Sequence, residues 1–237
     1  MATKRVSALA DLVRRNISLV RLLSDHTERR TVMLLYRSAS NFSTSDDPIE
    51  GTINSLAKDL QRLNIDYAIM GGNALKVHGF KRFTTDVDVL LAKGGKKKFA
   101  ENLVGRGYAP RFEKARSKFK HTSFNVDIDL VESGDFPGDG KPKEVAFPDP
   151  KESSFELANS SGVIINYLQL SSMIELKLAS YQSLPNERER DKLDVIELVK
   201  VTKIDEGFAI KLHPSVRNLY VECYQRAKRE LLKEELE

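Results

Sequence analysis

The chain has 237 residues, of which 41% are hydrophobic and 30% charged, a composition typical of a globular protein. No apolar run approaches the roughly 20 residues that cross a bilayer, so we expect no membrane segment. Cys223 is the single cysteine, which excludes an intrachain disulfide and a cysteine-based zinc site. The N-terminus lacks the apolar stretch of a secretory signal. We therefore expect a cytoplasmic protein, whose net charge of +4 permits a polyanionic partner.

Helical periodicity dominates the first part of the chain. Residues 6–38 carry an apolar face and predict two helices with a break near residues 24–27. Residues 38–48 are polar and rich in turn formers, which predicts a loop. A further helix is expected over residues 49–63, because Asp47 and Pro48 form a suitable start. Its inward face consists of Ile53, Leu56, Leu60 and Leu63.

The pattern then changes to short apolar strands. Residues 67–70 are wholly apolar, as expected of a strand buried on both faces, and Gly71-Gly72 ends it. A short helix over 73–78, a strand over 87–91, a helix over 96–106 and a strand over 124–131 are expected to follow. This order of elements predicts a small mixed α/β sheet.

The remainder of the chain returns to helices. Residues 134–150 are rich in Gly and Pro, which predicts a loop with at most one short strand. Helices are expected over 170–181, 188–201 and 215–236. The predicted fold class is α/β (α+β), a small mixed sheet flanked by helices. We divide the chain into an N-terminal helical segment (1–46), an α/β core (47–160) and a C-terminal helical region (161–237).

Candidate site residues begin at Gly71-Gly72. Two glycines after a buried strand let the backbone approach a phosphate, and the helix that starts at Asn73 presents N–H groups to an anion. Asp86 and Asp88 open the next strand, and residues i and i+2 of a strand project from one face. Adjacent carboxylates repel each other until a divalent cation lies between them. Mg²⁺ prefers such oxygen ligands and recruits substrate phosphates to complete its shell.

The strand at 124–131 offers a further carboxylate. Asp127 and Asp129 alternate with apolar residues and face the same way, so the pattern does not choose between them. We favour Asp129, because the Ile-Asp-Leu-Val run before the loop is typical of a strand's buried part. Two metal ions about 3.5–4 Å apart can stabilise both the attacking and the leaving oxygen of a phosphoryl displacement. The alternative is an amphipathic sheet with solvent-facing aspartates, although acidic residues are disfavoured in strands.

Two basic clusters lie beyond the paired aspartates, and they indicate either solvated faces or a path for nucleic acid or triphosphate. His121, among the basic residues, is expected to neighbour a phosphate, whereas His78 is expected to pack or to lie at the surface. The first cluster is Lys93, Lys96, Lys97 and Lys98, and the second is Arg111, Lys114, Arg116, Lys118 and Lys120, interleaved with Phe112 and Phe119.

Lys177 lies among apolar residues of a predicted helix. If it is partly buried it needs an anionic partner, which a triphosphate would supply; otherwise its ammonium group reaches solvent along an amphipathic helix. Asp191 and Asp194 either touch the substrate or pair with Arg188 and Lys177. Both alternatives are open at this point.

Taken together, these residues carry a family resemblance. The set Gly71-Gly72, short helix, Gly79, Arg82, Thr84-Thr85 and Asp86-Val-Asp88 resembles the signature of the polymerase-beta-type nucleotidyltransferase superfamily. The nearest branch is the minimal, abortive-infection-type (AbiEii-like) group, which includes bacterial toxin nucleotidyltransferases. Many members have Gly-Ser at the glycine pair and Ser at the position of Thr85, which keeps a hydroxyl here.

The resemblance implies specific roles. Asp86, Asp88 and Asp129 (or Asp127) would be catalytic and would bind Mg²⁺ or Mn²⁺. The nucleotide, an NTP such as ATP, would lie against Gly71, Gly72, Asn73, Arg82, Thr85, Lys177 and Asp191.

The expected reaction transfers a nucleoside monophosphate from an NTP to a hydroxyl acceptor and releases pyrophosphate. The base stays open, and so does the acceptor: a tRNA 3′ end, a protein side chain or a small molecule such as an aminoglycoside, with the basic clusters favouring RNA. The resemblance also implies a toxin neutralised by a partner protein. The alternative is a non-catalytic nucleotide- or RNA-binding module, which has no need of three clustered carboxylates. The oligomeric state is open.

Overall fold

The computed structural model describes residues 47–159 and 161–234. The helices predicted within residues 6–38, and with them the N-terminal segment 1–46, lie outside the described residues. Residues 43–237 cluster as one compact unit, to which all the elements below belong. None of the described helices combines the length and the apolar character that a bilayer crossing needs.

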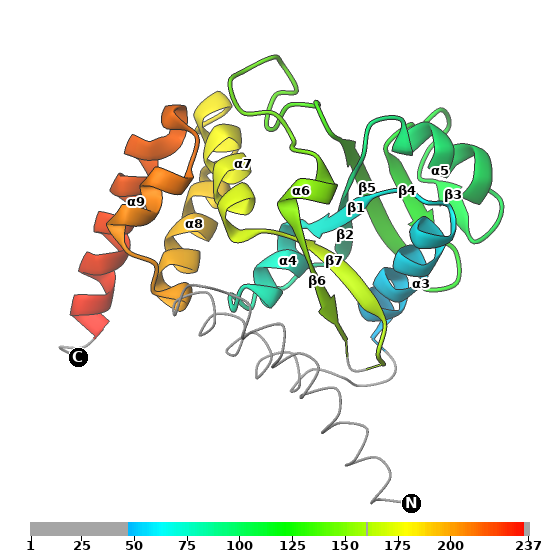
Figure 1. Ribbon diagram of the computed structural model, residues 1–237, viewed down its shortest axis with the longest axis horizontal. Coiled ribbons are helices and arrows are strands. Elements are labelled where there is room, and N and C mark those ends of the chain that lie inside the picture. Colours follow the sequence, from blue (N-terminus) through cyan, green and yellow to red (C-terminus); the bar gives the residue numbers. More distant parts are fainter. Residues whose placement is uncertain (1–46, 160, 235–237) are drawn as a thin grey trace, which may run out of the picture. The chain divides into compact units, whose positions relative to one another are not determined.

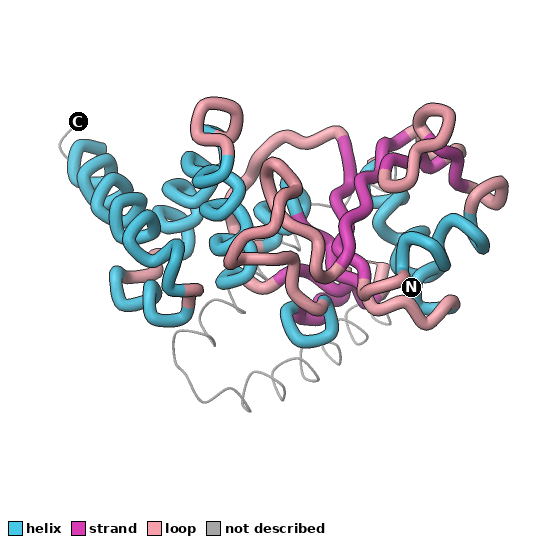
Figure 2. Tube along the Cα trace, turned by 90° about the horizontal axis from the view of Figure 1, so that it is seen from above, coloured by secondary structure: helices cyan, strands magenta, loops and turns pink. Residues whose placement is uncertain are grey.

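The centre of this unit is one mixed sheet of seven strands in the order β3-β4-β5-β2-β1-β7-β6. The β2–β5 and β1–β7 pairs are parallel, and the other pairs are antiparallel. In Figure 2 the strands form one band with helices on either side. The predicted mixed α/β class is therefore confirmed. The strands are β1 (Tyr67–Met70), β2 (Asp86–Leu91), β3 (Tyr108–Pro110), β4 (Lys118–His121), β5 (Val126–Glu132), β6 (Ser154–Ala158) and β7 (Ile164–Leu168).

Helices pack on both sides of the sheet. Figure 1 shows α3 and α5 together at one side of the strands, and α7, α8 and α9 grouped at the other. The helices are α3 (Pro48–Arg62), α4 (Gly71–Val77), α5 (Gly95–Leu103), α6 (Pro150–Ser153), α7 (Leu170–Ser183), α8 (Glu189–Thr202), the 3₁₀ helix η1 (Glu206–Lys211) and α9 (Pro214–Glu234).

Helix α3 illustrates how the predicted helices form. Asp47 caps its N-terminus by accepting a hydrogen bond from the Ile49 backbone N–H at 2.8 Å, and Pro48 occupies the first turn. Its buried face includes Ile53, Leu56 and Leu60, as the periodicity predicts. The helices expected at 73–78, 96–106, 170–181, 188–201 and 215–236 correspond to α4, α5, α7, α8 and α9 within a few residues.

The central strands have one apolar and one polar face. In β5, Ile128 and Leu130 are almost fully buried, whereas the alternating Asp127 and Asp129 are partly exposed. The apolar face packs under α3 and α5, where the rings of Phe99 and Phe119 lie 5.0 Å apart. The four aspartates of β2 and β5 therefore lie on the face opposite this core.

The sheet has more strands than the sequence predicts. The additional strands are β3, β4, β6 and β7. The sequence of β4 is Lys-Phe-Lys-His, and Phe119 is buried. The strand is difficult to predict because its two lysines make the short segment resemble a charged loop. β6 and β7 form a hairpin whose turn is held by Asn159, which accepts hydrogen bonds from the N–H groups of Ser161 and Val163. The Gly/Pro-rich segment carries no strand within residues 134–149, all of which are described.

Candidate active site

Four carboxylates form an in-register block on one face of the sheet. Strands β2 and β5 pair in parallel, with Asp86 opposite Asp127 and Asp88 opposite Asp129. Neighbouring strands are about 4.8 Å apart, so each aspartate has an acidic neighbour on the next strand as well as two residues along its own. The predicted candidates are thus brought together.

Asp88 lies at the centre of this negative charge. Burial of its carboxyl, together with the neighbouring charges of Asp86 and Asp129, raises the pKa of Asp88 to about 6. The cations Lys177 and Arg82 act in the opposite direction and lower this pKa. Asp88 is therefore within electrostatic reach of both the acidic block and two basic side chains.

Gly71 makes room for this carboxyl. A Cβ atom at position 71 would lie 1.8 Å from Asp88 Oδ2, and the backbone φ of +61° is itself unfavourable for other residues. Gly71 is the first residue of α4, directly after β1. The absence of a side chain at this residue therefore gives the Asp88 carboxyl its place against the backbone.

Gly72 and its neighbours have mainly structural contacts. A Cβ atom at position 72 would lie 2.7 Å from Thr84 Cβ, so this glycine lets α4 pack closely on the strand entry. Asn73 is buried and donates a hydrogen bond from Nδ2 to the backbone oxygen of Asp86 at 2.9 Å. Both residues thereby fix the start of β2, where the aspartates project.

The hydroxyl beside the acidic pair belongs to Thr84 and not to Thr85. Thr84 Oγ1 donates to Asp86 Oδ1 at 2.7 Å, whereas Thr85 is exposed. The prediction of Thr85 rested on the family resemblance alone. The i, i+2 spacing of Thr84 and Asp86 in extended backbone is the signal that would have identified Thr84.

Lys177 is buried in a charge network. Its side chain is 11% exposed, and its ammonium group lies 2.9 Å from Asp191 Oδ1 and 2.7 Å from Asp194 Oδ2. Arg82 Nη1 contacts the same Asp194 oxygen at 2.5 Å. Asp191 also accepts a hydrogen bond from Ser180 Oγ at 2.8 Å. Asp194 therefore contacts both cations and Asp191 contacts Lys177, so the predicted pairing with Lys177 is present in the structure.

This network links separate parts of the chain around the acidic block. Arg82 lies in the loop before β2, Lys177 on α7 and Asp194 on α8. Ser180, which the sequence analysis did not single out, lies three residues after Lys177, the spacing that places two residues on one helix face. Arg82 Nε is buried without a hydrogen-bond partner among the described residues.

The two candidates for the third carboxylate have different partners. Asp129 lies beside Asp88, contributes to its raised pKa, and forms an ion pair with Lys118 at 2.5 Å. Asp127 lies beside Asp86 and pairs with Arg111 at 3.1 Å and with Lys120 at 3.7 Å. Asp129 is thus the candidate nearer in register to the buried Asp88.

The donor set is suited to a divalent cation. Asp86, Asp88 and Asp129 bring three carboxylates to adjacent positions, and their mutual repulsion is of the kind that a divalent cation relieves. Within the described ranges no three His, Cys, Asp or Glu side chains are yet grouped to hold one metal ion. The carboxylate of Asp129 is paired with Lys118 instead.

Neither of the two central histidines lies in the acidic block. His78 is buried, packs its ring on Phe155 and contacts the backbone oxygen of Leu168 at 2.8 Å, which agrees with the predicted packing role. His121 pairs with Val126 in register and contacts Ser55 of α3, so it lies on the apolar face. The prediction that His121 neighbours a phosphate is therefore wrong.

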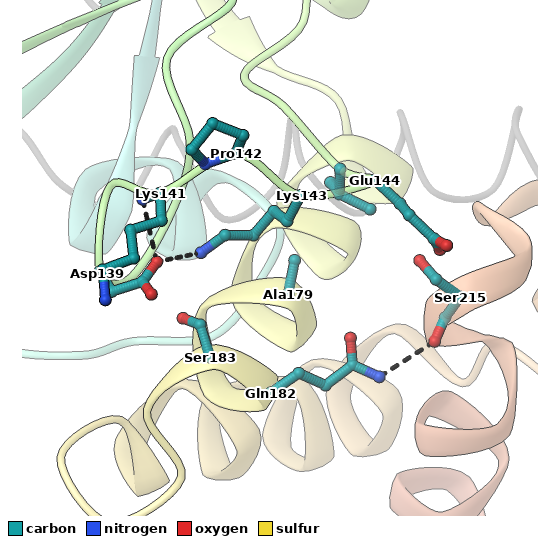
Figure 3. Close-up of a pocket in the computed structure, with 10 residues that line it drawn as sticks. Asp139, Lys141, Pro142, Lys143, Glu144, Ala179, Gln182, Ser183 and Ser215 are labelled. Atoms are coloured by element: carbon teal, nitrogen blue, oxygen red, sulfur yellow. Dashed lines mark hydrogen bonds and ion pairs between the residues drawn. The ribbon is translucent and has the colours of Figure 1, made fainter.

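A cavity of about 410 Å³ lies apart from these residues, between α7, the N-terminal end of α9 and the loop before α6. Figure 3 shows Lys141 and Lys143 of the loop close to Asp139, and Ser183 and Gln182 on α7 below them. None of the predicted site residues lines this cavity. Its lining residues on α7 are Ala179, Gln182 and Ser183, which lie on either side of Ser180 in the sequence.

Comparison with known proteins gives structural likenesses at low identity. No protein-family model matches the chain, and no curated protein sequence matches it. The chain is similar to an antigenic nucleotidyltransferase-like protein from Paracoccidioides brasiliensis, with 17% identity and a TM-score of 0.45 over 81% of this chain and 89% of that chain. For ANT(2")-Ia in complex with adenylyl-2"-tobramycin the identity is 13% and the TM-score 0.43, over 74% and 95%. For the lincosamide antibiotic adenylyltransferase LnuA, bound to lincomycin, the values are 16% and 0.41, over 62% and 94%. At such values the likeness concerns the backbone arrangement and not the chemistry.

Proposed function

We propose that this chain is a metal-dependent nucleotidyltransferase, which transfers a nucleoside monophosphate from an NTP to a hydroxyl acceptor. The observation that carries the proposal is the in-register block of Asp86, Asp88 and Asp129, with Lys177 (11% exposed) and Arg82 (24% exposed) within electrostatic reach of Asp88. Metal-dependent phosphoryl transfer requires carboxylates that bind metal ions and basic side chains that bind the substrate phosphates.

The carboxylates and the basic side chains have separate roles. Asp86, Asp88 and Asp129 would hold Mg²⁺ or Mn²⁺, and the metal supplies charge neutralisation on the phosphates and acidifies the attacking hydroxyl. Gly71 leaves room for the Asp88 carboxyl, and the triphosphate would lie beside that carboxyl. Lys177 and Arg82, held by Asp194, supply positive charge that is already oriented and costs little reorganisation during the reaction.

The reaction is an in-line displacement. The acceptor oxygen forms a bond to the α-phosphorus, the bond from this phosphorus to the bridging oxygen breaks, and pyrophosphate leaves. Thr84 and Asn73 touch no substrate in this scheme, because they orient Asp86 through its carboxylate and its backbone oxygen. We further propose RNA as the acceptor class, because the second basic cluster adjoins the acidic block.

The test is pyrophosphate release from each of the four NTPs with Mg²⁺ and total RNA. Wild type should release pyrophosphate, and Asp88→Asn should not. Asp66→Asn is the matched control, because Asp66 is exposed at the entry to β1 and lies outside the block. Equal turnover by Asp88→Asn would contradict the proposal. NTP binding by wild type without turnover on any acceptor would instead favour a non-catalytic nucleotide-binding module.

A further inference from the structure

Three basic side chains share a face with the acidic block. The register of β4 and β5 places Lys118 opposite Asp129 and Lys120 opposite Asp127. Arg111 reaches Asp127 from the residue after β3. We call Arg111, Lys118 and Lys120 the cationic ridge. Each of its members is ion-paired with a candidate metal ligand or with the neighbour of one.

The pairs of the ridge are exposed, unlike those of Lys177. The side chains of Arg111, Lys118 and Lys120 are 50%, 43% and 39% exposed, against 11% for Lys177. Exposed ion pairs contribute only about 0–1 kcal/mol to stability. The fold therefore does not depend on them, and these cations can change partners at little cost.

Lys118 and a metal ion compete for one carboxylate. The Lys118 ammonium lies 2.5 Å from Asp129 Oδ2 and neutralises it. A divalent cation bound by Asp88 and Asp129 would repel that ammonium and release it. The freed positive charge would then stand next to the acidic block, where the acceptor must arrive.

We propose that the cationic ridge binds the phosphate backbone of a single-stranded nucleic acid, and that a metal at the carboxylates releases the ridge for this purpose. Metal binding and strand binding are thus positively coupled, and each strengthens the other by the same factor. The inference rests on the proposed function, since it takes the carboxylates as the metal site.

The chemistry around the ridge favours a single strand. Phe112, next to Arg111, is 57% exposed, and Lys114 and Arg116 of the same loop are exposed. Exposed aromatic rings beside a line of cations suit unpaired bases, which stack while the phosphates bind the cations. An acidic protein segment would use the charges but would leave the ring without this role.

The first test is fluorescence anisotropy of a labelled 12-nucleotide RNA, and of DNA with the same sequence, with EDTA or with Mg²⁺ and without NTP. Divalent cations ordinarily weaken nucleic-acid binding by screening. We expect the opposite for wild type, namely binding of at least one of the two strands that is roughly fivefold or more tighter in Mg²⁺, at the lower end of typical coupling.

Two variants distinguish the pairing from general charge. Asp129→Asn frees Lys118 permanently, so it should bind tightly in EDTA and gain nothing from Mg²⁺. Glu113→Gln removes an exposed acid from the same loop and should respond to Mg²⁺ as wild type does. Strand binding that falls on addition of Mg²⁺ in both wild type and Glu113→Gln would overturn the inference.

The second test measures the metal directly by calorimetric titration with Mn²⁺. Lys118→Met should bind Mn²⁺ several-fold more tightly than wild type, and Lys114→Met should not. In Mg²⁺, Lys118→Met should also reduce the steepness of log K for strand binding against log salt concentration. The expected reduction of this slope is about 0.7, the contribution of one phosphate contact on a single strand. Unchanged Mn²⁺ affinity in Lys118→Met would overturn the inference.

Pyrophosphate release on the same preparations separates this inference from the proposed function. An active enzyme whose strand binding ignores Mg²⁺ would refute the coupling and leave the nucleotidyltransferase standing. Coupled metal and strand binding without any NTP turnover would refute the nucleotidyltransferase alone.

Discussion

The two faces of the central sheet are built from the same strands but differ in the burial and the charge of their side chains. On the face under α3 and α5, side chains such as Val87, Ile128 and Phe119 are at most 1% exposed and belong to the hydrophobic core. On the opposite face, Asp127 and Asp129 of β5 form ion pairs with the basic side chains Arg111, Lys118 and Lys120. Apolar burial thus characterises one face, and paired charges characterise the other.

Strand alternation thus places the core residues and the proposed site residues on opposite faces of the sheet. A substitution on the apolar face should unfold the protein, whereas one on the charged face should leave it folded but change what it binds.

The largest effect is expected at the third carboxylate. Asp129→Asn should remove measurable NMP transfer, because Asp129 lies in register with the buried Asp88. Asp127→Asn should retain transfer, because Asp127 lies opposite Asp86 and is occupied by Arg111 and Lys120. The two variants remove the same group from one strand, so each controls the other in a turnover assay. Loss of activity in Asp127→Asn alone would reverse the assignment.

The apolar face should respond in stability and not in binding. Phe119→Ala should lower the free energy of unfolding by about 3–5 kcal/mol, because it removes a fully buried ring. Lys120→Met, at the next position and on the other face, should change it by less than about 1 kcal/mol. Urea denaturation of both variants measures the contrast. Equal losses would show that the two faces do not differ as described.

His78 makes stability depend on pH. Burial lowers the pKa of His78 from 6.5 to about 4, so the folded protein holds the neutral form while the unfolded chain takes up a proton. Its contribution is complete above pH 6.5 and is lost as the pH falls from there toward 4. Wild type should lose about 2 kcal/mol more than His78→Gln between pH 7 and pH 5. Parallel pH profiles of the two proteins in urea denaturation would refute this assignment.

Substitution of Gly71 should have a modest effect on stability and a clear effect on the site. Gly71→Ala should destabilise by about 1–2 kcal/mol through its left-handed backbone, and it should also displace the Asp88 carboxyl and reduce transfer. Gly94→Ala is the matched control, because its φ is +83° and no atom lies within 4 Å of the new Cβ. If the two variants retain equal activity, the close approach at Gly71 has no catalytic importance.

Local pattern sufficed to predict much of this molecule. The buried strand Tyr67–Met70 and the i, i+2 aspartates of β2 and β5 follow from period and composition alone. Helix α3 could likewise be located from its cap and its apolar face.

The remaining features depend on pairing between distant segments. β4 is recognisable as a strand only when its lysines are seen opposite the aspartates of β5. Likewise, Lys177 was predicted to need an anion, but its choice of Asp191 and Asp194 follows from the packing of α7 on α8. The sequence of a single segment does not predict strand register or helix packing.

The most direct test of the central claim is transfer of labelled nucleotide. The purified protein is incubated with each α-³²P-labelled NTP, Mg²⁺ and total RNA, beside Asp86→Asn and the control Asp66→Asn. We predict that wild type and Asp66→Asn label a discrete RNA with at least one NTP, and that Asp86→Asn labels none. Equal labelling by Asp86→Asn would contradict the account, and so would a wild-type protein that neither binds nor transfers any NTP.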